Sequence, residues 1–117
     1  MIDIIPHVAE LLAATGAQIE LSYRDTYVTF PLIVLSTPVN AATTNGGAEV
    51  FTNITVQVDA YTLDKKATID LAQSIDAIMT PAGFTRGICQ PSTEDGMERY
   101  MMQYSCKVNF THTDILI

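Results

Sequence analysis

The sequence predicts an α+β domain in which two helices pack on a mostly antiparallel sheet, in the order α-β-β-β-α-β-β. Three observations lead to this fold class. Apolar and polar residues alternate through most of the segment from Val50 to Thr62, which is typical of a half-buried strand. The segment from Lys65 to Met79 repeats its apolar residues at helical spacing. The other strand-like segments are joined by hairpin connections, which favour antiparallel neighbours.

The first half of the chain supplies one helix and three strands. Between residues 3 and 16 the apolar residues recur at helical spacing, so a short amphipathic helix is expected. Residues 18–23 alternate and predict a strand, with a turn at residues 24–26. The compact apolar run from Phe30 to Leu35 predicts a further strand. Pro31 places the start of that strand at an edge or a bulge, because proline cannot donate to a ladder.

The second half supplies the other helix and two strands. Asp64 is the expected N-cap of the helix from Lys65 to Met79. Residues 84–90 are expected to form a strand, residues 91–96 a turn, and residues 98–111 a long last strand.

Two features of this half allow more than one interpretation. Tyr100, Met102 and Tyr104 form a stripe that either packs in the core or lies at a subunit interface. The apolar segment at residues 115–117 either continues the last strand or docks on a partner.

The segment from Thr37 to Gly47 is uncharged and small, and we expect it to be a loop between two strands. Eleven residues is long for such a connection, and long loops in compact domains tend to be functional or disordered. This loop is therefore our candidate contact site for other subunits or partners. The residues expected to make the contact are Asn40, Thr43, Thr44, Asn45, Gly46 and Gly47.

Composition narrows the function classes. A length of 117 residues predicts one domain covering residues 1–117. Only 16% of the residues are charged, which indicates that partners cover part of the surface. The net charge is −7 and the six Lys and Arg residues are scattered, so direct nucleic-acid binding is not expected. No run of apolar residues is long enough for a membrane span, and the first residues do not resemble a signal peptide. We therefore expect a protein made in the cytosol.

The sequence contains no recognisable catalytic, cofactor-binding or metal-binding set. His7 and His112 have no Cys, Ser or carboxylate at a useful spacing. Asp70 and Asp76 lie too far apart around a helix to bind one ion, and Asp59 is expected to be solvated. The two cysteines, Cys89 and Cys106, are expected to be free thiols that behave as small hydrophobic residues. We therefore expect no enzyme activity.

The order of several short motifs resembles that of a known family. Phe30-Pro-Leu-Ile-Val-Leu and a polar loop precede Val56-Gln-Val-Asp-Ala-Tyr-Thr and an apolar-faced helix. Gly83-Phe84, Arg86 and a closing Arg99-Tyr100 strand follow. Over about residues 17–110 the chain resembles the tail-completion or head–tail joining proteins, including tail terminators, of long-tailed bacteriophages and prophages.

The resemblance implies a structural and assembly role without catalysis. It implies a ring of identical subunits, commonly a hexamer, at the head-proximal end of the tail. Such a ring joins the tail tube protein to the head connector proteins and terminates tail growth. The protein would be assembled in the bacterial host cytoplasm and would remain in the neck or tail of the virion. The alternative is a small-ligand-binding or regulatory α+β domain with a ferredoxin-like layout, which would need a pocket with convergent polar groups.

Overall fold

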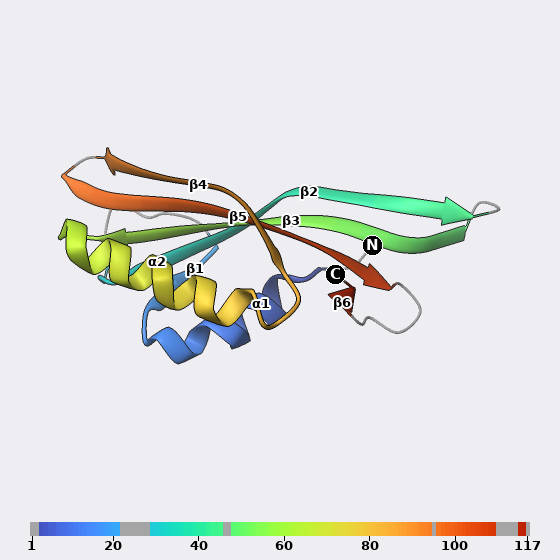
Figure 1. Cartoon of the computed structure of the whole chain (residues 1–117), viewed down its shortest axis with the longest axis horizontal. Coiled ribbons are helices and arrows are strands. Elements are labelled where there is room, and N and C mark those ends of the chain that lie inside the picture. The colour runs from blue at the N-terminus through green and yellow to red at the C-terminus, as the bar shows by residue number, and fades with distance from the viewer. Residues whose placement is uncertain (1–2, 22–28, 46–47, 95, 110–114, 117) are drawn as a thin grey trace.

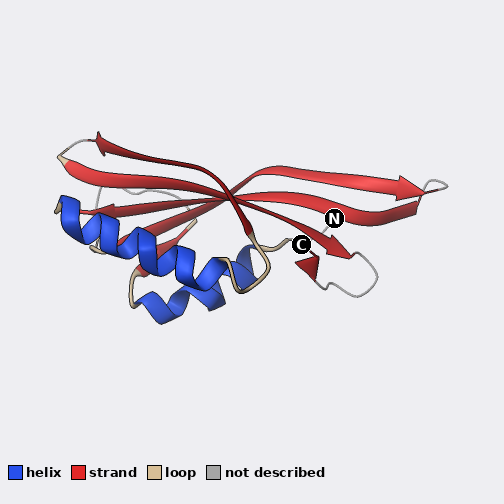
Figure 2. Cartoon of the chain, viewed as in Figure 1, coloured by secondary structure: helices blue, strands red, loops and turns tan. Residues whose placement is uncertain are grey.

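The computed structural model of the chain describes residues 3–21, 29–45, 48–94, 96–109 and 115–116. Two helices, α1 (Ile5–Leu12) and α2 (Lys65–Met79), lie on one side of a six-stranded sheet (Figures 1 and 2). A short 3-10 turn, Ala13–Thr15, extends α1. The strands are β1 (Gln18–Glu20), β2 (Leu32–Asn45), β3 (Ala48–Thr62), β4 (Thr85–Glu94), β5 (Met97–Asn109) and β6 (Ile115–Leu116).

The sheet is mostly antiparallel, so the predicted α+β class is confirmed. Its strands lie in the order β1-β2-β3-β5-β4, and β6 pairs with β5. Among the described strands, the one parallel pair joins β1 to β2, with Gln18 opposite Leu32. The turn expected at residues 24–26 lies outside the described residues. The segment at residues 115–117 is expected either to continue the last strand or to dock on a partner. Ile115 and Leu116 do not continue β5 but form the separate strand β6, which pairs antiparallel with Val108 and Lys107 of β5.

The prediction of a loop from Thr37 to Gly47 is wrong for residues 37–45, and Gly46 and Gly47 lie outside the described residues. β2 continues to Asn45, and each residue from Val39 to Asn45 has a partner in β3. The composition of this segment suggested a loop because small, uncharged residues are common in loops. Thr and Val also fit an exposed strand that has a neighbour to pair with. In the same way, β4 extends to Glu94 and takes up most of the turn expected at residues 91–96.

The helix that follows β3 begins where the sequence predicts. The Asp64 carboxylate accepts a hydrogen bond from the backbone N–H of Ala67 at 3.1 Å, which satisfies a donor at the start of α2. The Thr62 and Thr68 hydroxyl groups contact each other under this cap. The strand-to-helix corner is thus fixed by side-chain hydrogen bonds as well as by packing.

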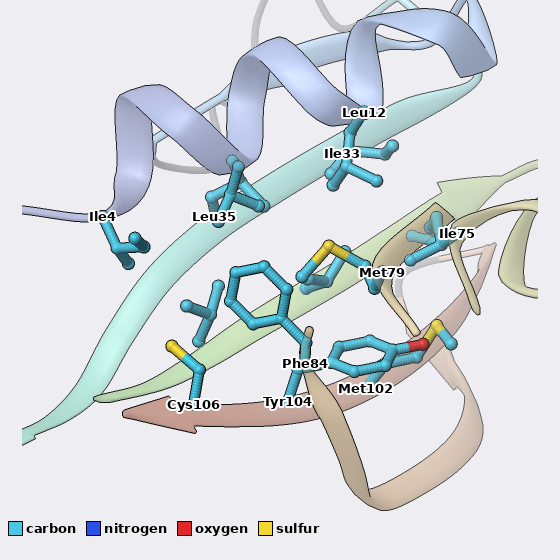
Figure 3. Close-up of a cluster of buried hydrophobic side chains, with 14 of the residues drawn as sticks. Ile4, Leu12, Ile33, Leu35, Ile75, Met79, Phe84, Met102, Tyr104 and Cys106 are labelled. Atoms are coloured by element: carbon cyan, nitrogen blue, oxygen red, sulfur yellow. The ribbon is translucent and has the colours of Figure 1, made fainter. Parts of the chain in front are cut away.

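The main core lies between the helices and the sheet (Figure 3). Alternate residues of β3 face it and are buried, as the sequence pattern predicts: Thr52, Ile54, Val56, Val58 and Ala60. Met102 and Tyr104 of β5 are also buried there, which favours core packing for the aromatic and sulfur stripe. α2 contributes Ile75 and Met79, both fully buried.

The helices do not cover the whole sheet. Figure 1 shows β2 and β3 running past the helices to one end of the molecule, which measures 51 × 27 × 22 Å. We call residues 39–45 of β2 and 48–55 of β3 the arm. We call the part of the sheet that carries the helices the body. β5 runs beside the base of the arm, where Asn109 is opposite Phe51. Beyond that level the arm consists of β2 and β3 alone in the described part of the chain.

Candidate interaction surface

A β-bulge in β2 separates the body from the arm. Ser36 pairs with Gln57 and the next registered pair is Val39 with Thr55, so β2 uses three residue steps where β3 uses two. The extra residue lies at Thr37–Pro38. A bulge of this kind bends a strand and increases its twist. Pro38 is suited to the position because it has no N–H to place in the ladder.

The outer edge of β2 is the longest open strand edge that the structure describes. β1 covers this edge only at residues 32–34. Of the described strands, none pairs with the outer side of β2 from Leu35 to Asn45. This stretch contains no charged residue. Natural edge strands are usually protected by charged side chains, by proline or by bulges, because open edges pair with other chains. Here only the bulge and Pro38 give that protection.

β4 forms the opposite edge of the sheet. It pairs with β5 on its inner side, and a bulge lies between Arg86 and Cys89. Pro91 lies within this strand, opposite Tyr100, and Ile88 at the bulge is 56% exposed. The sheet therefore ends in two unlike open edges, one on each side. Nothing in the sequence indicated that β4 would be an edge, because the order of strands in a sheet cannot be read from spacing.

The predicted contact residues fall at the arm. The structure places Asn40, Thr43, Thr44 and Asn45 in β2, where Asn40 is opposite Ile54 and Asn45 is opposite Ala48. Gly46 and Gly47 lie outside the described residues. The four described residues are therefore brought together on one strand edge and not in a flexible loop. Their role as contact residues stays a prediction.

A groove runs between α2 and the strands β4 and β5. Its volume is about 420 Å³, and its lining includes Ile69, Asp76, Arg86, Cys89 and Tyr100. The Tyr104 hydroxyl donates a hydrogen bond to Asp76 Oδ1 at 2.9 Å. Arg86 lies 3.5 Å from the other Asp76 oxygen. The charged and polar groups at this end of the groove are thus engaged with one another.

The pKa values of three side chains near α2 and β5 are raised. Burial, and then the hydrogen bond to Asp76, raise the pKa of the Tyr104 phenol, so this group stays protonated. Burial also raises the pKa of the Cys89 thiol, against a weaker opposite effect of Arg86. Burial raises the pKa of Cys106 to about 11. Neither cysteine is an activated nucleophile, because activation requires a lowered thiol pKa.

The face of the sheet opposite the helices contains a partly buried ion pair, in which Asp59 is buried and Arg99 is partly exposed. Arg99 Nη2 lies 2.7 Å from Asp59 Oδ1, and Arg99 Nε donates to the same oxygen at 2.9 Å. The Gln57 amide donates to Asp59 Oδ2 at 2.9 Å. The expectation that Asp59 is solvated is therefore wrong, since Asp59 is only 6% exposed. Arg99 is 40 residues away in the sequence, so only the pairing of β3 with β5 brings the two together.

The described residues offer no set of groups for metal binding. They contain no cluster of three or more His, Cys, Asp or Glu side chains that could hold a metal ion. His7 is exposed on α1, and His112 lies outside the described residues. Both cysteines are free thiols, as expected, although Cys89 is only partly buried. The two sheet edges and the arm remain the most distinctive surfaces.

The chain matches no family model and no curated protein. Of the described helices, none is long and apolar enough to cross a membrane.

Proposed function

We propose that this protein is a structural subunit of a phage or prophage tail, which forms a ring at the head-proximal end and joins the tail tube to the head connector. The arm carries the proposal. It extends the sheet beyond the helices and has an uncharged outer edge from Leu35 to Asn45. A segment of this kind contributes little to a core of its own, so its role is contact with other chains.

The sequence resemblance over about residues 17–110 supplies the identity of the assembly. Its motifs fall on elements of the body. Val56-Gln-Val-Asp-Ala-Tyr-Thr forms the second half of β3, and Gly83-Phe84 leads from α2 into β4. The resemblance gives the hexamer as the expected ring and tail termination as part of the role.

The acidic composition is compatible with a neck protein. A net charge of −7 disfavours binding to DNA that passes through a ring. The same charge makes two copies repel each other at long range. Contacts between copies therefore favour uncharged segments, and the outer edge of β2 is the longest of these in the sheet.

A small-ligand-binding role is less well supported. The groove beside α2 has a volume within the range of ligand sites. A ligand site needs a few polar groups that point into it and are available to the ligand. In this groove Asp76 accepts from Tyr104 and Thr80 and faces Arg86, so these groups already have partners.

Electron microscopy of the purified, concentrated protein tests the ring. We expect closed particles of one cyclic symmetry, most often sixfold, with a central channel. Native mass spectrometry of the same sample gives the number of copies. A protein that stays monomeric at millimolar concentration would contradict the proposed ring.

Immunogold labelling of particles from a strain that carries the gene tests the location. We expect label at the junction of head and tail. If no tailed particle carried the gold label, the result would contradict the assignment to a virion.

A shortened arm tests the contact role in the same strain. Removing residues 44, 45, 48 and 49 joins Thr43 to Val50 through Gly46 and Gly47, and leaves every β3–β5 pair in place. We expect a normally folded subunit and unjoined heads and tails. The matched control variant carries no deletion. It replaces the exposed Ile69 of α2 with Ala and should give joined particles. Normal infectious particles from the shortened variant would show that the arm tip is not a contact.

A further inference from the structure

We infer that neighbouring copies join edge to edge, with the arm edge of β2 in one copy pairing antiparallel to β4 of the next copy. The inference rests on the proposed ring and names the surfaces that would form it. A closed ring of identical subunits needs two unlike surfaces that fit each other. In the described part of the chain, the two long open edges of the sheet are β2 beyond Val34 and β4.

The strand directions are compatible with a continuous sheet. β2 is antiparallel to β3, β3 to β5, and β5 to β4. If the next copy is placed in the same orientation, its β4 therefore runs opposite to β2. Antiparallel pairing is the more stable and the commoner of the two kinds.

The lengths of the two edges also agree. The open stretch of β2 runs from Leu35 to Asn45, and β4 runs from Thr85 to Glu94. Side chains on the same face must lie opposite each other across the join. We call the face of the sheet opposite the helices the open face. Ala41 is level with Asn53 on this face, and Gln90 is level with Met101 and Asp59 on the same face. Placing Ala41 opposite Gln90 pairs both edges over nearly their whole length.

This register requires a stagger between copies. Gln90 lies at the level of Asp59 within its own sheet, and Ala41 lies at the level of Asn53. The difference along β3 is 59 − 53 = 6 residues, or roughly 20 Å at the usual rise per residue. From its β2 edge to its β4 edge each copy adds the four strands β2, β3, β5 and β4, a width of roughly 19 Å. Because the shift and the width are of similar size, the strands would tilt by about 45° from the axis of the ring. This tilt is within the range at which sheets close on themselves.

The position of the helices leaves room for this stagger. The helices cover the body, and β2 and β3 extend past them (Figure 2). A copy shifted along the arm places its own helices beside the part of the arm that its neighbour leaves uncovered. β1 covers β2 only at residues 32–34, outside the paired stretch. Pro91 removes one hydrogen-bond donor from β4, so the join is one donor short at that position.

Cysteine trapping in the full chain tests the register. Ala41→Cys and Gln90→Cys are combined in a Cys89→Ser background, and the assembled protein is oxidised with copper phenanthroline. Both positions are exposed in the subunit. We expect a ladder of covalent multimers from the double variant. An equal mixture of the two single variants should give dimers only, because each copy then carries one engineered cysteine and can be linked to only one neighbour.

A matched control replaces Gln90→Cys with Thr85→Cys, which lies on the same strand and the same face. Thr85 would lie about four residues from the position opposite Ala41, too far for a disulfide, so the cross-link yield should fall at least about tenfold. Circular dichroism and thermal unfolding should match between the Gln90 and Thr85 variants, which shows that both fold.

Four results would overturn the edge-to-edge join. Dimers from Ala41→Cys alone would indicate a twofold pairing of β2 with β2. Equal yields from the Gln90 and Thr85 variants would mean that no register is fixed. Rings seen by electron microscopy without any cross-link would leave the proposed ring intact and reject this interface. A protein that forms neither rings nor cross-links would reject both.

Discussion

The body and the arm contain parts of the same two strands, yet they differ in what stabilises them. In the body, β2 and β3 pack against two helices, and Ile33 and Val58 are fully buried. In the arm, Val39 of the same strand is 47% exposed, and the helices do not lie over the outer part of the arm. The body supplies most of the apolar burial that stabilises the fold. At the base of the arm Ile54 of β3 still packs in the main core, whereas the outer part of the arm depends on strand pairing and on its attachment to the body. This difference is the reason why we propose a contact role for the outer part of the arm.

A pair of truncations along β2 gives the largest expected difference between the two regions. Ile33→Ala in the body should lower the free energy of unfolding by about 3 kcal/mol, because it removes fully buried atoms and leaves a cavity. Val39→Ala in the arm should change it by less than about 0.5 kcal/mol, because the side chain is half exposed. Urea unfolding of both variants measures this. Equal losses would mean that the arm contributes to the core.

A second pair compares two basic residues on the open face of β5. Arg99→Met in the body leaves the buried Asp59 carboxylate without its cation and should cost about 2–3 kcal/mol, since Arg99 itself is partly exposed. Lys107→Met at the level of the arm, opposite Asn53, should cost less than about 0.5 kcal/mol. Chemical unfolding at low salt checks both values. A double variant with Asp59→Asn should recover part of the Arg99 loss, which a purely steric effect would not allow.

The pH dependence of the free energy of unfolding tests the burial of the Cys106 thiol in the body. The pKa of Cys106 rises from 9.0 in the unfolded chain to about 11 in the folded protein. Below pH 9 the thiol is protonated in both states, so its full contribution is present. Above that the unfolded chain releases its proton first, and stability falls as the pH rises through about 11. The total loss from this group is on the order of 2 kcal/mol.

Cys106→Ala should remove this part of the pH dependence, measured as the slope of unfolding free energy between pH 9 and 11. The slope that remains includes contributions from Cys89 and Tyr104, whose raised pKa values act in the same direction. Cys89→Ala is the control on the neighbouring strand, where the thiol is only partly buried. If both cysteine variants kept the wild-type slope, burial of Cys106 would not be its cause.

The smallest effect concerns the rates at which the two thiols react. In the native protein, Cys89 should react with a thiol reagent faster than Cys106, because Cys106 is 7% exposed and Cys89 is partly accessible. After denaturation without reductant, both should react, giving two groups per chain. Titration with a chromogenic thiol reagent measures both numbers. A count of zero after denaturation would indicate a disulfide.

The body and the β3 part of the arm could be predicted from the sequence, whereas the β2 part of the arm could not. The helix from Lys65 to Met79 has both its cap and its periodicity in the sequence, and its bounds are confirmed. The alternation in β3 likewise identifies the buried face. The arm strand from Thr37 to Asn45 has no such signal, because neither of its faces is strongly apolar and its partner in β3 supplies the order. The Asp59–Arg99 pair and the β4 edge depend on the order of strands, which local patterns do not contain.

Hydrogen exchange on the free and the assembled protein tests the contact role of the arm most directly. In the free subunit, amides on the outer edge of β2 from Val39 to Asn45 should exchange much faster than those of Val56 and Val58 in the body. In the assembled ring, the β2 edge and β4 should become protected together, while the amides of α2 keep their rates. If the arm edge exchanged at the same rate in both forms, the arm would not be the contact between copies.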